Sequence, residues 1–451
     1  MAEAVTEQSI VARIERMPFG WWQIRARLIV GTATFFDGFD LIAIASALPV
    51  LRTEWGLSPA DIGPLISIGF VGQLIGALAF AWVAERYGRL RALAWSVAIF
   101  SVMSLVCAAA DGYWSLLAAR FLQGIGIGGE IPVAATYINE WSRAEKRGRF
   151  FLLYQMVFGV GLSLSQLISW WVVPHWGWRA MFLIGAAPAI IAALLRTLLP
   201  ESPRWLVNKG RAAEADRVVG DVEAFITARG VALPPPKPVE FVKPVAATRL
   251  MELFEGRYFQ RTMLVWSLWF CAFFITYGTN GWLPTIFTSI YKLPVDEALL
   301  LGAANGIASV MAGLLVAFGI DYIGRRWWFA LAFLIGSLPL FAIWWTGAPS
   351  AYLVFYLSAL SYVFLGTMST GTQLYTPELY PTRMRVLGTS CASVWARVGS
   401  TLAPIFVGYV LPGHGVGGVF AMFGAVGILG AVVTGLLGVE TKDRVLEEVS
   451  P

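Results

Sequence analysis

The sequence predicts an all-α membrane protein with twelve transmembrane helices in two six-helix bundles. Three observations support this fold class. Hydrophobic residues make up 57% of the 451 residues and charged residues only 14%, whereas soluble domains carry about 25% charged residues. Apolar segments long enough to cross a bilayer, which takes about 20 helical residues, recur along the whole chain. A short polar pattern also repeats at matching places in its two halves.

The apolar segments form two groups of six, separated by one long polar stretch. Their approximate ranges are 27–51, 62–84, 91–110, 114–138, 150–173, 177–199, 262–290, 298–320, 327–347, 351–376, 386–411 and 418–438. The polar stretch contains RAAEADRVVGDVEAFITAR, whose apolar spacing predicts one or two short surface helices. We therefore expect an N-terminal bundle over 1–199, a cytoplasmic linker over 200–261, and a C-terminal bundle with a cytoplasmic tail over 262–451.

The distribution of basic residues predicts the orientation. Nearly all of the 33 Lys and Arg residues flank the segments on one side, and the loops of the other side carry only Arg52, Arg179 and Lys292. The positive-inside rule makes the basic side cytoplasmic, with both termini there. The net charge of +5 follows from these loops. We expect the lipid bilayer as a partner, no nucleic-acid partner, and a monomer.

Two carboxylates interrupt the first segment. Asp37 and Asp40 are three residues apart, so they share one face of a helix. An ionisable group at membrane depth costs at least a few kcal/mol unless it faces protein or a wet cavity. We interpret the two as part of a substrate or proton path. The alternative is that structural partners hold two buried acids.

The fourth segment also carries two charges, Arg120 and Glu130. A helical rise of about 1.5 Å per residue places Arg120 at about the same depth as Asp40, which predicts an intramembrane ion pair. Glu130 falls in the cytoplasmic half, near Arg196 of the sixth segment. We favour a structural role for that pair, and the alternative is a part in proton coupling.

Polar residues in the fifth and seventh segments are candidates for substrate binding. Gln155 and Gln166 are eleven residues apart, about three helical turns, and therefore share a face. The seventh segment, FFITYGTNGWLPTIF, has a Gly/Pro pattern typical either of a broken helix that binds substrate or of a simple kink. Its candidates are Tyr277, Asn280 and Trp282.

The eleventh segment places Arg397 near mid-membrane. A guanidinium at that depth needs an anion. The candidates are Asp37, Asp40 and the carboxylate of a substrate, which a guanidinium binds bidentately.

The internal repeat joins AWVAERYGRLR (81–91) to AFGIDYIGRRW (317–327) without a gap. Each copy follows the second segment of its half and places an acid before a Gly-Arg pair in a tight turn. Such charges can pair with neighbouring helices and bias one conformation; the alternative is that they only set the topology. The gating candidates are Glu85, Arg86, Arg89, Asp321 and Arg325.

Catalytic and metal chemistry is not indicated. The only histidines, His175 and His414, lie in short loops beside Pro or Gly, and no nucleophile–base pair is readable. We expect no metal, no cofactor and no enzymatic activity.

These motifs make the chain resemble the major facilitator superfamily over its whole length. The resemblance rests on the two loop motifs together with RFLQGIGIGGE, NEWSRAEKRGR, LPESPRWL, YTPELYPTRMRVLG and VETKDRVLEE. FFDGFD is similar to the aromatic acid–proton symporters, and GIGIGGEIPVA, LLRTLLPESP and VWARVGSTLAPIFVG look most like bacterial niacin transporters and their organic-ion relatives. The resemblance implies alternating access, Asp40 and Arg120 as a proton-coupling pair, and Arg397 as a residue that meets an anionic substrate.

Together these patterns predict a proton-coupled secondary transporter of a bacterial inner membrane. It would import a small organic acid, an aromatic monocarboxylate such as nicotinate or a hydroxybenzoate. Asp40, Asp37, Arg120 and Glu130 would couple protons. The alternatives are a sugar or polyol:proton symporter, an organic cation transporter, and a non-transporting membrane receptor.

Overall fold

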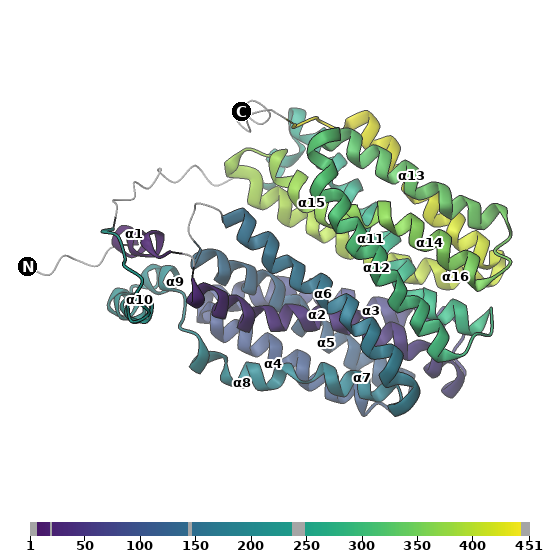
Figure 1. Ribbon diagram of the computed structural model, residues 1–451, viewed down its shortest axis with the longest axis horizontal. Coiled ribbons are helices and arrows are strands. Elements are labelled where there is room, and N and C mark those ends of the chain that lie inside the picture. Colours follow the sequence, from purple (N-terminus) through teal and green to yellow (C-terminus); the bar gives the residue numbers. More distant parts are fainter. Residues whose placement is uncertain (1–6, 19, 143–146, 237–248, 443–451) are drawn as a thin grey trace, which may run out of the picture. The chain divides into compact units, whose positions relative to one another are not determined.

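The computed structural model describes residues 7–18, 20–142, 147–236 and 249–442, and regular structure within these ranges is helical (Figure 1). The N-terminal membrane segments fold as α2 (Trp21–Glu54), α3 (Pro59–Tyr87), α4 (Arg89–Ala108), α5 (Tyr113–Glu140), α6 (Arg147–Trp176), α7 (Trp178–Gly185) and α8 (Pro188–Leu198). The C-terminal segments fold as α11 (Gly256–Ser289), α12 (Val295–Ile323), α13 (Arg325–Trp345), α14 (Ala351–Leu365), α15 (Thr367–Glu378) and α16 (Thr382–Leu437).

The twelve predicted spans are confirmed. In the described residues, ten helical stretches are long and apolar enough to cross a membrane. The last of them, within α16, is long enough for two spans, and Gly415 interrupts it with the non-helical angles φ 65° and ψ −169°. Helix α5 supplies the remaining span, although Arg120 and Glu130 interrupt its apolar run.

Helix α11 corrects one alternative for the seventh segment. It runs without interruption from Gly256 to Ser289, with Pro284 inside, so the broken-helix interpretation is wrong. The glycines have a packing reason instead. A Cβ at Gly278 would lie 2.7 Å from the ring of Phe423, and one at Gly281 would lie 3.3 Å from Ile66. Glycine lets these side chains approach the helix backbone.

The polar regions form a small helical group outside the membrane segments. It consists of α1 (Glu7–Arg16), α9 (Pro203–Asn208) and α10 (Ala212–Thr227), and η1 (Leu250–Phe254) follows later in the chain. Helix α10 confirms the helix expected in the linker. Figure 1 shows α1 beside α9 and α10. Two isoleucines of α1 and Met17, which follows the helix, are buried in the same apolar cluster as residues of α9 and α10. Arg13 and Arg16 both pair with Glu223.

Contacts divide the chain into two compact units, which we describe separately. The first unit comprises 1–40, 71–164 and 179–244, and the second comprises 41–70, 165–178 and 245–451. The division of the chain into 1–199, 200–261 and 262–451 stays a prediction.

Close backbone contacts through glycine organise the first unit. A Cβ at Gly38 would lie 2.6 Å from the carbonyl oxygen of Phe158, so α2 and α6 touch backbone to backbone beside the two aspartates. Gly128 meets the backbone of Gln73 in the same way and brings α5 against α3. These glycine contacts let α2 pack closely on α6, and α5 on α3. Close packing of this kind restricts the movement of the polar side chains on these helices.

Candidate functional site

The centre of the first unit is a buried ion pair between α2 and α5. Nη1 of Arg120 donates to both carboxylate oxygens of Asp40 at 2.7 Å. Asp40 is 4% exposed and Arg120 is 3% exposed. The ion pair predicted from the equal depth of Asp40 and Arg120 is therefore present in the structure. At this burial each charge depends on the other, because an uncompensated ion in a low-dielectric interior is strongly unfavourable.

A short chain of hydrogen bonds extends from the guanidinium to α4, whereas Nε of Arg120 has no hydrogen-bond partner in the described part of the structure. The same Nη1 also donates to Oε1 of Gln123 at 2.7 Å, and Nε2 of Gln123 donates to Oγ of Ser104 at 2.7 Å. The thiol of Cys107 lies 3.5 Å from the same Oε1. Gln123 was not among the residues predicted from the sequence. Its spacing of three residues from Arg120 was the available signal, since such residues are neighbours on a helix.

The other two proton-coupling candidates are buried nearby. Asp37 lies about one turn before Asp40 on α2. Glu130 accepts a hydrogen bond from the Thr34 hydroxyl at 2.8 Å, which links α5 to α2. The expected neighbour Arg196 has a side chain outside the described part of the structure, so that pair stays a prediction.

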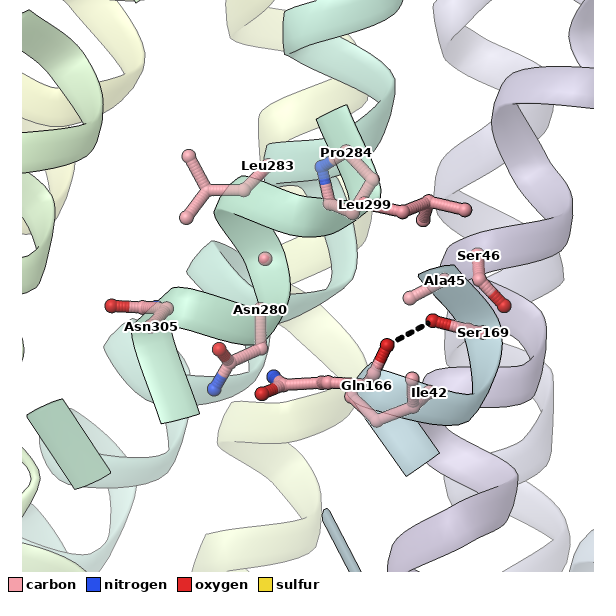
Figure 2. Close-up of a pocket in the computed structure, with 11 residues that line it drawn as sticks. Ile42, Ala45, Ser46, Gln166, Ser169, Asn280, Leu283, Pro284, Leu299 and Asn305 are labelled. Carbon is pink, nitrogen blue, oxygen red and sulfur yellow. Dashed lines mark hydrogen bonds between the residues drawn. The ribbon is translucent and has the colours of Figure 1, made fainter. Parts of the chain in front are cut away.

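A small cavity in the second unit is lined by five polar side chains, among them the substrate candidates Gln166 and Asn280 (Figure 2). Its volume is about 20 Å³, which is room for about one water molecule. Amide and hydroxyl groups line it together with apolar residues, and the lining holds no charged side chain. The lining residues are Ile42, Ala45, Ser46, Gln166, Ser169, Asn280, Leu283, Pro284, Leu299, Gly302 and Asn305.

The amides of this cavity are only partly satisfied. Figure 2 shows the side chains of Asn280 and Gln166 pointing toward one another. Asn280 also lies 3.4 Å from the Tyr362 hydroxyl. Oε1 of Gln166 and Oδ1 of Asn305 are buried without a hydrogen-bond partner. Unsatisfied buried polar atoms are uncommon in native structures, so their presence in a cavity indicates room for a ligand group or a water.

The structure separates the remaining substrate candidates. Tyr277 packs edge-on against Phe70 at 5.1 Å and stacks on Phe273 at 5.6 Å. Trp282 is fully buried, and its indole N–H donates to the carbonyl of Pro404 at 3.1 Å, so it packs α11 against α16 rather than lining the cavity. Arg397 is half-buried on α16. The side chain of Gln155 lies outside the described residues.

The second unit is tightly packed along a seam between α3 and α16. A Cβ at Gly63 would lie 2.7 Å from the carbonyl oxygen of Pro404 and 2.9 Å from Cα of Ile405. The Ser67 hydroxyl donates to the carbonyl of Thr401 at 2.6 Å. We call this contact of 59–70 with 401–408 the α3–α16 seam.

The first loop motif forms a network of charges around the start of α4. Arg89 pairs with Glu85 at 2.8 Å and with Glu140 at the end of α5 at 2.9 Å. The backbone N–H of Arg89 donates to Glu201 at 3.0 Å. Gly88 permits this approach because a Cβ there would clash with the Glu201 carboxylate, and its positive φ of 108° also favours glycine. Burial raises the pKa of the Glu201 carboxyl, and the N–H donors of Ser202, Leu90 and Arg89 act against that shift.

The second loop motif repeats this arrangement around the start of α13. Arg325 pairs with Asp321 at 2.7 Å and with Glu378 at the end of α15 at 3.3 Å. Its backbone N–H donates to Glu440 at 2.8 Å, beside Gly324 with φ 92°. The acids four residues before each arginine are therefore paired, as their matched positions suggested.

Arg86 differs from the other gating candidates. It is exposed and lies over the ring of Trp82 at 5.3 Å. The acids that complete the two networks were not among the gating candidates; they are Glu140, Glu201, Glu378 and Glu440. All four stand in motifs that carry the family resemblance, NEWSRAEKRGR, LPESPRWL, YTPELYPTRMRVLG and VETKDRVLEE.

Metal ligands do not cluster in the described residues. No group of three or more His, Cys, Asp or Glu side chains there could hold a metal ion.

Comparison with known proteins gives a consistent picture. A family model described as sugar (and other) transporter matches residues 28–451. The chain is 34% identical to the niacin transporter NiaP of Acinetobacter baylyi over 450 residues, which cover 98% of this chain and 99% of that protein. It is 30% identical to the 4-hydroxybenzoate transporter PcaK of Pseudomonas aeruginosa over 418 residues, which cover 91% of each protein.

Solved structures share the fold at lower sequence identity. A D-xylose–proton symporter superposes with a TM-score of 0.71 at 20% identity, covering 94% of this chain and 99% of the other. A bacterial homologue of the human lysosomal transporter Spinster gives a TM-score of 0.68 at 18% identity, covering 93% and 96%.

Proposed function

The chain belongs to the sugar (and other) transporter family of the major facilitator superfamily, and from that premise we propose that it is a proton-coupled symporter for a small aromatic monocarboxylate. Nicotinate and hydroxybenzoates are the proposed substrates, because the relatives include transporters of niacin and of 4-hydroxybenzoate. We place it in a bacterial inner membrane, as a monomer with both termini in the cytoplasm. Transport follows alternating access.

The buried pair of Asp40 and Arg120 carries the proposal of proton coupling. Both oxygens of Asp40 accept from one guanidinium nitrogen at 2.7 Å, and both residues are nearly inaccessible to solvent. A proton on Asp40 removes one partner of a desolvated pair, an event of several kcal/mol that can drive a change of conformation. Asp37 and Glu130 are the reserve carriers on the same two helices.

The substrate end of the proposal combines one charge with neutral amides. Arg397 supplies the bidentate guanidinium for the carboxylate. Asn280 and Gln166 offer amide groups to the polar edge of the ring, and Asn305 joins them because it lines the same cavity with an unpartnered oxygen. Tyr277 offers an aromatic face. Gln155, which the sequence spacing puts on the same helical face as Gln166, stays a candidate from the sequence alone.

The small cavity volume fits a state in which the substrate is absent. The α3–α16 seam lies in the same unit as the cavity and is closed by backbone contacts. We propose that opening this seam enlarges the cavity and admits the substrate. The two loop networks, centred on Arg89 and Arg325, then change the relative populations of the conformations with the seam closed and with the seam open.

A ligand-stabilisation screen of the purified protein tests the substrate class. Nicotinate and 4-hydroxybenzoate should raise the melting temperature, whereas xylose and organic cations should not, because bound ligand stabilises only the protein it binds. Stabilisation by a sugar alone would support the sugar-symporter alternative and contradict the proposal.

The role of Arg397 is tested with pairs of acids and amides. Nicotinate should bind at least thirtyfold more tightly than nicotinamide, because losing one partner of a desolvated charge pair costs about 2–5 kcal/mol. Arg397→Ala should abolish this preference, and Arg397→Lys should retain part of it; the ligand-free melting temperature of each variant is measured beside binding to confirm that the variant folds. Equal binding of acid and amide by the wild type would make Arg397 a structural residue.

A further inference from the structure

Gln123 completes the buried cluster around Arg120. Its side chain is fully buried on α5, one turn from the arginine. Oε1 accepts from Nη1 of Arg120 at 2.7 Å, and Nε2 donates to the hydroxyl of Ser104 at 2.7 Å. Gln123 therefore connects the ion pair to α4.

The orientation of this amide is fixed by chemistry. A guanidinium offers only donors, so the Gln123 atom that faces Arg120 must be the oxygen. The amide nitrogen then faces Ser104, whose hydroxyl can accept. Because both ends are engaged, Gln123 cannot flip without losing two hydrogen bonds.

Gln123 and Asp40 consequently share one donor. Nη1 of Arg120 lies 2.7 Å from both carboxylate oxygens and 2.7 Å from Oε1 of Gln123. When Asp40 takes up a proton, Arg120 loses its counter-charge but keeps the neutral oxygen of Gln123. An arginine with no remaining acceptor on this side would have to leave the site or prevent the protonation.

We propose that Gln123 is a positioning residue for proton coupling, which holds Arg120 in place while Asp40 is protonated and makes that protonation easier by sharing Nη1. This inference rests on the proposed proton symport. The other groups to be considered around Asp40 are Cys107 on α4, which interacts electrostatically with both Asp40 and Arg120, and Asp37 on its own helix. Glu130 lies farther along α5 and bonds Thr34.

The test is the pH profile of proton-driven uptake in proteoliposomes. Gln123→Met keeps the side-chain length but removes the oxygen, so Arg120 is left to Asp40 alone. We expect the midpoint of the profile to move by about one pH unit to the acidic side, a tenfold change in proton concentration, while the KM for the aromatic acid stays within twofold. Gln123→Glu keeps an oxygen at the same position and should not show the acidic shift.

Two controls separate this role from simple packing. Ser96→Ala removes another fully buried hydroxyl of α4, one that bonds only its own helix at Leu93, and should leave the midpoint unchanged. If Gln123→Met does not reach the membrane, Gln123→Asn replaces it, because its amide is one methylene shorter. Reduced uptake at every pH with an unchanged midpoint would overturn the inference.

Asp40→Asn, measured beside these variants, separates a failure of the proposed proton symport from a failure of the proposed role of Gln123. If Asp40→Asn retains accumulation driven by a pH gradient, the proposed proton symport through Asp40 is wrong. If Asp40→Asn loses accumulation but Gln123→Met keeps the wild-type midpoint, only the role of Gln123 is wrong.

Discussion

Gly63→Val should open the α3–α16 seam. A Cβ at this position would lie 2.7 Å from the carbonyl oxygen of Pro404 and 2.9 Å from Cα of Ile405. Both contacts are with backbone atoms, so the neighbours cannot yield by rotating a side chain. Overpacking of this kind costs about 1–3 kcal/mol. The cost applies only to the conformation in which the seam is closed, so the closed population should fall about 5- to 150-fold relative to the open one.

The assay is the reactivity of a cysteine placed at the seam. In a background without Cys107, Cys271 and Cys391, Ser67→Cys introduces a thiol where the Ser67 hydroxyl bonds the carbonyl of Thr401. A membrane-impermeant maleimide applied to intact cells should label it slowly. Adding Gly63→Val should accelerate labelling about 5- to 150-fold, the same factor by which the closed conformation should become less populated relative to the open one.

A matched glycine provides the control. Gly313 lies within α12, and a Cβ there would meet nothing within 4 Å. Gly313→Val should therefore leave the labelling rate unchanged, although it makes the same substitution inside a helix. If Gly63→Val folds normally and labels no faster than the background, the seam is not a gate and the reasoning is wrong.

Three further substitutions test other parts of the account. Asp321→Asn should lower the maximal transport rate several-fold with little change in apparent affinity, because Asp321 pairs with Arg325 and we propose that this network biases one conformation. Uptake kinetics showing a loss of affinity at an unchanged maximal rate would contradict this. Asn305→Leu should weaken substrate binding without lowering the ligand-free melting temperature, since Oδ1 has no protein partner to lose; a large fall in that temperature would make Asn305 a structural residue. Glu223→Ala should release α1 and speed tryptic cleavage near Arg13 several-fold, because Glu223 binds both arginines of that helix; an unchanged cleavage rate would show that the apolar contacts of α1 suffice.

The sequence predicted the features that depend on helix register. The number of spans follows from hydrophobic length. The pairing of Asp40 with Arg120 follows from their equal depth, because two charges at one level of an apolar core need each other. The loop motifs were found because their repeat is exact enough to align without a gap.

The sequence did not predict features that depend on distant partners. Glu201 and Glu440 approach the loop arginines from more than 100 residues away, and no local pattern encodes that approach. Asn305 was missed because one polar residue in an apolar helix does not reveal which face meets a cavity. The broken-helix interpretation of α11 was wrong for a related reason. Its glycines make room for Phe423 and Ile66 of other helices, and the local sequence does not show those contacts.

Transport in proteoliposomes tests the central claim most directly. With an imposed proton gradient, the wild type should accumulate labelled nicotinate or 4-hydroxybenzoate above the equilibrium level. A protonophore should abolish that accumulation, and Asp40→Asn should retain exchange but lose accumulation. If no aromatic acid accumulates, or if accumulation persists without a proton gradient, the account of a proton-coupled aromatic acid symporter is contradicted.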